Sequence, residues 1–204
     1  AAVVIEAAVE VEAAAEVRPV AEELSTSSSV AAPPAEAAAT EELALERAVA
    51  QEIAGASVWS SSLARKVRHI SPTQPAQCLG LSLRALLRPA AEGDTKKARV
   101  AAAKERLRRG AKLLSELSAG VDDAPAVLLG ALEATCALHA PLGEVFERLV
   151  LALYELETDV LSEEAIFTWA KQAKRAREDS VRRRFVAQSA ALLEWLQDAD
   201  EEDE

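Results

Sequence analysis

Methionine is absent from this sequence, and cysteine and aromatic residues are scarce. Because no initiator methionine is present, we expect the chain to be part of a longer protein. Two cysteines, Cys78 and Cys136, are too few for the disulfide framework of a small secreted domain, and no apolar run approaches the ~18 residues of a membrane helix. The first residues carry acidic side chains throughout, unlike a signal or transit peptide. These absences predict a cytoplasmic protein without a membrane segment.

The sequence also lacks the short motifs of the common enzyme classes. It has no glycine loop that would cradle a phosphate, no Gly-x-Ser-x-Gly elbow and no His-Glu-x-x-His. Cys136 and His139 are spaced one helical turn apart, but zinc usually takes four ligands, and only Cys78 and the distant His69 remain. A buried helical cysteine beside a partly exposed histidine is therefore the favoured interpretation. We predict a non-enzymatic chain with no catalytic residue, metal or cofactor.

The abundant residues are those that favour helices. Alanine, leucine, glutamate, arginine and lysine dominate after about residue 79, where β-branched residues are few. A chain of 204 residues is long enough for one medium domain and a flanking segment. We therefore predict an all-α fold built around one core.

The charge of the chain is strongly negative but unevenly spread. A net charge of -11 argues against a nucleic-acid binder that relies on overall attraction to phosphate, and it favours a basic partner. Cations gather over residues 96–112 and 171–184. The first of these stretches could contact RNA phosphates, yet no aromatic residue is interleaved to stack a base, and a solvated outer helix is the favoured interpretation. RNA binding is expected to be weak at most.

The chain divides into four predicted segments. Residues 1–40 are rich in Ala, Glu, Ser and Pro and are predicted to be a disordered linker. Residues 41–57 form a helix whose attachment to the domain stays open, residues 58–198 form the domain, and residues 199–204 are an acidic tail.

Apolar periodicity and helix breakers predict a series of helices. They cover residues 41–55, 77–87, 94–117, 121–139, 144–157, 163–176 and 179–198. We expect a bend or interruption near Gly110, capping by Asp122, Asp123 and Ser162, and an inward position for Leu138. Helices of these lengths joined by short breaks fit a HEAT-like α-solenoid or an irregular helical bundle.

Two tryptophans are predicted at the margins of apolar helix faces, beside carboxylates. The last helix has an apolar stripe made of Val181, Phe185, Ser189, Leu192 and Leu196. Trp195 falls roughly 100° from the centre of that stripe on a helical wheel. Trp169 flanks a stripe made of Ile166, Phe167, Ala170 and Ala173. Each tryptophan alone fits ordinary core packing, but the pair beside acidic clusters indicates a binding surface for a basic partner.

Two segments of the sequence resemble a known family. They are "LSEEAIFTWA" at residues 161–170 and the terminal Leu-x-Trp-Leu followed by acids. Both are similar to the W2 domain, which has two aromatic/acidic boxes and lies at the C-terminus of eukaryotic translation initiation factor 5 and of the epsilon subunit of exchange factor 2B. The resemblance runs clearly over residues 95–204 and loosely back to residue 58. It implies a HEAT-like (MIF4G-type) α-helical solenoid.

The resemblance also implies which residues bind a partner. The first box would be Tyr154, Glu155, Glu157, Asp159, Glu163, Glu164, Phe167 and Trp169. The second box would be Trp195, Asp198, Asp200, Glu201, Glu202, Asp203 and Glu204. In the family, this acidic surface docks lysine-rich segments of the beta subunit of initiation factor 2, where charge steers the partner and aromatic side chains anchor it.

The resemblance leaves open which of two family members the sequence matches better. "LLGALEATCALH" and the basic stretch before the last helix look more like initiation factor 5, whose domain is an assembly adaptor that also contacts initiation factors 3 and 1. The epsilon subunit of factor 2B would instead use the domain to promote GDP release, and a basic-helix RNA-binding module is a further alternative. The Ala-rich N-terminal part resembles neither the zinc-containing domain of factor 5 nor the sugar-transferase-like and β-helix regions of the exchange subunit.

Overall fold

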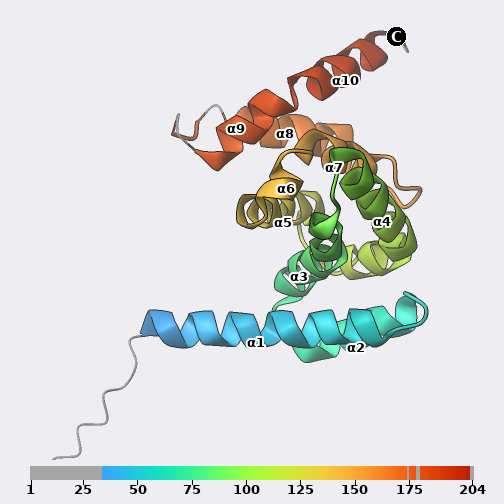
Figure 1. Ribbon diagram of the computed structural model, residues 1–204, viewed down its shortest axis with the longest axis vertical. Coiled ribbons are helices and arrows are strands. Elements are labelled where there is room, and N and C mark those ends of the chain that lie inside the picture. The colour runs from blue at the N-terminus through green and yellow to red at the C-terminus, as the bar shows by residue number, and fades with distance from the viewer. Residues whose placement is uncertain (1–33, 174, 178–179, 203–204) are drawn as a thin grey trace, which may run out of the picture. The chain divides into compact units, whose positions relative to one another are not determined.

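The computed structural model describes residues 34–173, 175–177 and 180–202, and all regular structure in these ranges is helical (Figure 1). The longer helices are α1 (Pro34–Gly55), α2 (Ser61–Ile70), α3 (Pro75–Leu87), α4 (Lys96–Ser118), α5 (Ala124–Leu138), α8 (Glu163–Ala173) and α10 (Ala190–Glu202). The shorter ones are the 3₁₀ helix η1 (Arg88–Glu92), α6 (Ala140–Gly143), α7 (Phe146–Tyr154) and α9 (Val181–Gln188). The all-α prediction is confirmed.

The helices pack mainly on neighbours that are close in sequence. Helix α3 packs on α1, α4 and α5, and α5 in turn packs on α8 and α9. One hydrophobic core runs through them from Val49 in α1 to Leu196 in α10. This succession of packed helices around a continuous core is the arrangement expected of a HEAT-like fold.

Helix α1 is joined to the core by buried side chains. Val49 and Ile53 are fully buried, and the Ile53 carbonyl accepts a hydrogen bond of 3.1 Å from the Trp59 indole nitrogen. The helix begins at Pro34, within the segment predicted to be a linker. A proline in the first helical turn is tolerated because its missing N–H would have no intrahelical partner there. Residues 1–33, where the rest of the predicted linker falls, lie outside the described residues.

Helix α4 runs without interruption through Gly110, where we expected a bend or an interruption. Gly110 allows close packing here, since a Cβ atom at this position would lie 2.7 Å from Cδ1 of the buried Leu86 and would force that side chain to shift. The inward positions predicted for Leu107, Leu113 and Leu114 are confirmed.

The start and the end of α5 both differ from prediction. Asp123 stands at the N-cap with a φ of 52°, in the left-handed region, and its side chain makes no capping hydrogen bond. A typical capping residue has an extended backbone that aims its oxygen at the first turn, so Asp123 is not a side-chain cap. Leu138, expected to face inward, is 67% exposed because α5 ends there and the chain turns through His139 into α6.

The single helix predicted over residues 179–198 is two helices that meet at Ser189. The Ser189 N–H is shared between the carbonyls of Phe185 at 3.0 Å and Val186 at 3.1 Å, which tightens the last turn and ends α9. Phe185, Leu192 and Leu196 are buried as predicted. Val181, at the start of the predicted stripe, is 42% exposed.

Candidate partner-binding surface

The residues of the predicted first box extend from the end of α7 into α8. Tyr154 is the last residue of α7, and Glu157 and Asp159 are exposed in the following loop. Ser162 caps α8 as predicted, because its Oγ accepts a hydrogen bond of 3.3 Å from the N–H of Ala165. Glu163 and Glu164 occupy the first turn of α8, where their negative charge is favourable to the helix dipole.

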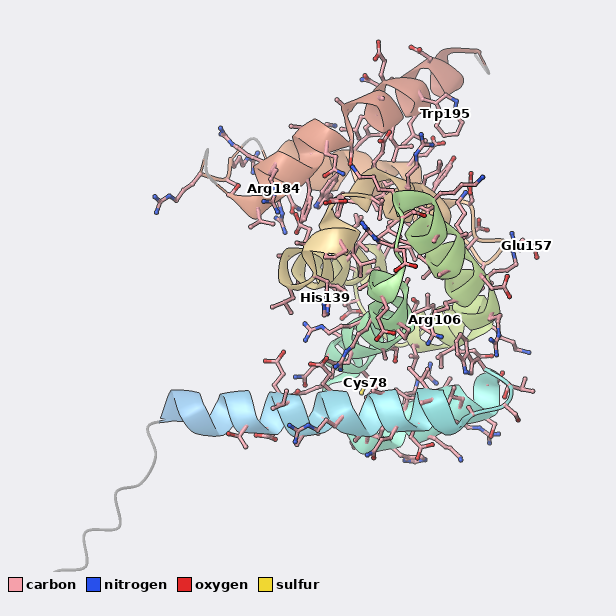
Figure 2. The ribbon with its side chains drawn as sticks, in the orientation of Figure 1. Cys78, Arg106, His139, Glu157, Arg184 and Trp195 are labelled. Carbon is pink, nitrogen blue, oxygen red and sulfur yellow. The ribbon has the colours of Figure 1, made fainter. Side chains whose placement is uncertain are left out.

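Trp195 of α10 lies against Tyr154 of α7. Their ring centroids are 6.4 Å apart and the rings are inclined at 82°, an edge-to-face contact. The Tyr154 hydroxyl donates a hydrogen bond to Oε1 of Glu163 on α8. We call these three residues the Tyr154–Trp195 surface, and Figure 2 shows Trp195 on its outer helix. The two boxes, separated in sequence, thus meet in space.

The indole of Trp195 is available to a partner. It is 52% exposed, whereas Leu192 and Leu196 on the same helix are buried. The ring is therefore in contact with Tyr154, and about half of the residue remains open to solvent. An aromatic ring in such a position can contact both the stem and the ammonium group of a lysine.

Trp169 belongs to the core, and its predicted position at the margin is wrong. It is 4% exposed and its ring stacks on Phe146 with centroids 5.6 Å apart. Phe146 in turn stacks on Phe185 at 4.2 Å. The buried face of α8 is rotated towards Trp169, which leaves Phe167, placed inside the stripe by the sequence, only partly buried.

The carboxylates of the first box differ in whether they are engaged. Glu155 forms an ion pair of 2.8 Å with Lys104 of α4, and Glu163 is held by Tyr154. No ion pair of Glu157, Asp159 or Glu164 is found within the described residues. Lys104 is 51 residues from Glu155, and no local sequence signal could have paired them. Free and exposed carboxylates therefore remain for a basic partner.

The second box is described only in part. Asp198 is exposed on α10. The backbone of Asp200, Glu201 and Glu202 continues the helix, while their side chains and the whole of Asp203 and Glu204 lie outside the described residues. The part that the structure describes thus places Trp195 and Asp198 on the helix that leads to the acidic end of the chain.

The cysteine and histidine considered as zinc ligands are Cys136, which is buried, and His139, which is partly exposed. Burial raises the pKa of the Cys136 thiol to about 12, so the thiolate that a metal needs is disfavoured. Among the described residues, no three His, Cys, Asp or Glu side chains are grouped as metal ligands. Within the same ranges, every helix is too short or too polar to cross a membrane.

Comparison with known proteins assigns the C-terminal part of the chain to a family. Residues 125–204 match the family model W2, described as eIF4-gamma/eIF5/eIF2-epsilon. Over 78 residues the chain is 40% identical to eIF5-mimic protein 1 of Mus musculus and 38% identical to the protein of that name in Homo sapiens. It is 38% identical over 77 residues to eIF5-mimic protein 2-B of Danio rerio. No solved structure matches the chain.

These matches define the extent of the similarity. Each covers 38% of this chain and 17% of the relative, so the matching segment spans less than a fifth of the curated relatives. The W2 match over residues 125–204 takes in α5, except its first residue, to α10 and both predicted boxes. Helices α1 to α4 precede the matched region and share its core.

Proposed function

We propose that the W2 domain is a docking domain for translation initiation factors, whose Tyr154–Trp195 surface binds lysine-rich segments of the beta subunit of initiation factor 2. Through this contact the chain would help to assemble the preinitiation complex. The family match and the relatives named as eIF5 mimics support a protein-binding role related to translation initiation. The observation that carries the finer proposal is the contact of Tyr154 with Trp195, which brings the two boxes together.

The surface is suited to bind lysine by two different interactions. A lysine ammonium over the open face of Trp195 would contribute roughly 0.5 to 2 kcal/mol. The exposed carboxylates of the two boxes, at Glu157, Asp159 and Asp198, would attract a cationic segment and raise its association rate. The aromatic ring therefore sets the lifetime of the complex, and the acids set the rate at which it forms.

The side chains of the Tyr154–Trp195 surface are restrained before binding, which reduces the conformational entropy that they lose when a partner binds. Trp195 packs against Tyr154, and Glu163 is held by the Tyr154 hydroxyl, so the indole and one carboxylate of the surface are restrained before the partner arrives. Side chains that are already restrained lose less conformational entropy on binding. Trp169, which is 4% exposed, would act in the core and would not contact the partner.

Surface plasmon resonance with an immobilised lysine-rich peptide tests the proposal. We expect Trp195→Ala to speed dissociation about 2- to 30-fold, which corresponds to the roughly 0.5 to 2 kcal/mol above. Ending the chain after Asp198 should mainly slow association and flatten its dependence on salt, because it removes acidic residues without touching the indole.

Leu138→Ala is the matched control, since Leu138 is a similarly exposed apolar side chain on α5. It should leave both rate constants unchanged. A folded Trp195→Ala protein that binds the peptide with unchanged kinetics would contradict the proposal.

A further inference from the structure

A cluster of cations on α4 surrounds the buried ring of Trp59. The guanidinium carbon of Arg109 lies 4.7 Å from the centre of the Trp59 ring, and that of Arg106 lies 5.4 Å from it. The Trp59 ring is 8% exposed and its nitrogen is already bound to the Ile53 carbonyl. Two positive charges are thus held over one indole; Figure 2 labels Arg106 on α4.

A hydrogen bond to the end of α3 fixes the Arg106 side chain. Its Nε donates a hydrogen bond of 2.6 Å to the carbonyl of Leu86. Partial burial, together with repulsion from Arg109, lowers the pKa of the Arg106 guanidinium. An anion placed between the two groups would relieve this repulsion.

The carboxylates near the cluster are engaged with other groups. Glu105 is paired at 3.8 Å with Arg108, and Glu116 accepts a hydrogen bond of 2.7 Å from the hydroxyl of Ser61. For Arg109 and Lys112, which are exposed, no ion pair is found in the part of the chain that the structure describes. The spacing of three residues places these two on one side of α4.

Helix α2 extends the positive surface. It packs on α4 and carries Arg65, Lys66 and Arg68 with no carboxylate of its own. Arg68 donates a hydrogen bond to the carbonyl of Glu116, which ties the two helices together. Lys66 pairs with Glu52 of α1 at 3.7 Å, while Arg65 is exposed and has no ion pair within the described residues.

We propose that Arg106, Arg109 and Lys112 form a contact site for the phosphate backbone of RNA. Guanidinium groups offer paired donors that match the oxygens of a phosphate, and a row of cations fits a ligand whose charge repeats along its length. The exposed positions of α4 around the site carry alanine and charged residues, with no large apolar side chain that would anchor a protein partner. RNA is therefore favoured over an acidic protein segment.

The geometry also indicates that the site does not recognise the bases of the RNA. Trp59 is covered by the two guanidinium groups and is too buried to stack on a base. Contact is therefore limited to phosphates, and binding is independent of base sequence. Because the chain has a net charge of -11, the contact is weak and disappears as salt rises. The site lies before residue 125, outside the W2 match, and does not depend on the docking role proposed above.

Fluorescence anisotropy of the whole chain with a labelled 20-nucleotide oligouridine tests this site. Each phosphate contact on a single strand contributes a slope of about 0.7 in the logarithm of affinity against the logarithm of salt, or about fivefold at 0.1 M salt. We expect Arg109→Gln to weaken binding about fivefold and to flatten that slope by about 0.7. Lys112→Gln should do the same.

Arg148→Gln is the charge-matched control, because Arg148 is an exposed cation on α7 that lies beside Lys96, Lys97 and Lys104 of α4 and is not one of the cations over Trp59. It should leave RNA affinity within twofold of the parent chain. Thermal unfolding of each variant checks that it is folded. Equal losses in Arg148→Gln and Arg109→Gln, or unchanged affinity in a folded Arg109→Gln chain, would overturn the proposal. So would polyglutamate of the same length if it bound as tightly as the RNA, because the site would then accept any polyanion.

Discussion

Replacing Trp169 with alanine should unfold or strongly destabilise the domain, and it should weaken peptide binding only through that loss. The side chain is 4% exposed and stacks on Phe146, which itself stacks on Phe185. Truncating a buried tryptophan to alanine costs about 3 to 5 kcal/mol. A domain of this size is stable by about 5 to 15 kcal/mol, so the substitution removes a large part of the total.

Trp169→Phe separates packing from hydrogen bonding at the same position. The Trp169 indole nitrogen is buried and has no hydrogen-bond partner in the described residues. Phenylalanine removes this unsatisfied group, a gain of about 1 to 3 kcal/mol, but leaves a small cavity that costs a comparable amount. The free energy of unfolding should therefore stay within about 1 kcal/mol of the parent value.

Urea unfolding followed by circular dichroism measures both substitutions, and peptide binding is then measured at a urea concentration where each variant is folded. We expect folded Trp169→Phe to bind a lysine-rich peptide like the parent chain. If the free energy of unfolding of Trp169→Ala is within about 1 kcal/mol of the parent value and the variant still loses peptide affinity, Trp169 is a contact residue and its assignment to the core is refuted.

Three further predictions follow from the buried parts of the fold. Gly110→Ala should lower the free energy of unfolding, measured by urea titration, by about 1 kcal/mol, because overpacking against Leu86 costs about 1 to 3 kcal/mol and exceeds the gain in helix propensity. A variant more stable than the parent chain would contradict this. Cys136 should resist iodoacetamide at pH 8 in the folded chain, because its thiol has a pKa of about 12 and is buried; labelling as fast as in urea would show that the site is open. A chain that begins at residue 34 should have a melting temperature within a few degrees of the whole chain, whereas one that begins at residue 56 should melt at a much lower temperature because it loses Val49 and Ile53. Equal melting temperatures of the two shortened chains would show that α1 contributes nothing to the core.

The features predicted from sequence are those that depend on neighbouring residues. Apolar spacing gave the helical segments, and Ser162 before two glutamates marked the start of α8. Leu107, Leu113 and Leu114 recur at the helical period, so their burial follows from one helix considered alone. Helix position and most of the core are therefore accessible without a structure.

The features missed depend on contacts made by distant parts of the chain. Nothing in the sequence around Ser189 breaks a helix, since neither glycine nor proline is present, yet α9 ends at Gln188 and α10 begins at Ala190. The predicted stripe of α8 included Phe167 and left Trp169 at its margin. The buried face contains Trp169 in place of Phe167, a rotation of roughly 40° that is enough to bring a marginal residue into the core. The pairing of Lys104 with Glu155 and the stacking of Arg106 and Arg109 on Trp59 join residues more than 45 positions apart.

If the two aromatic/acidic boxes act as one surface through the contact between Tyr154 and Trp195, substitutions at these two residues should be energetically coupled in peptide binding. A double-mutant cycle on binding of a lysine-rich peptide tests it most directly, using Trp195→Ala, Tyr154→Leu and the chain with both changes. Residues in contact that serve one ligand are expected to show a coupling free energy of at least about 0.5 kcal/mol. Trp195→Ala combined with Leu138→Ala, whose side chain lies on α5, should be additive. If the losses from Trp195→Ala and Tyr154→Leu add without coupling in folded proteins, the two boxes bind independently and the account of a joint surface is contradicted.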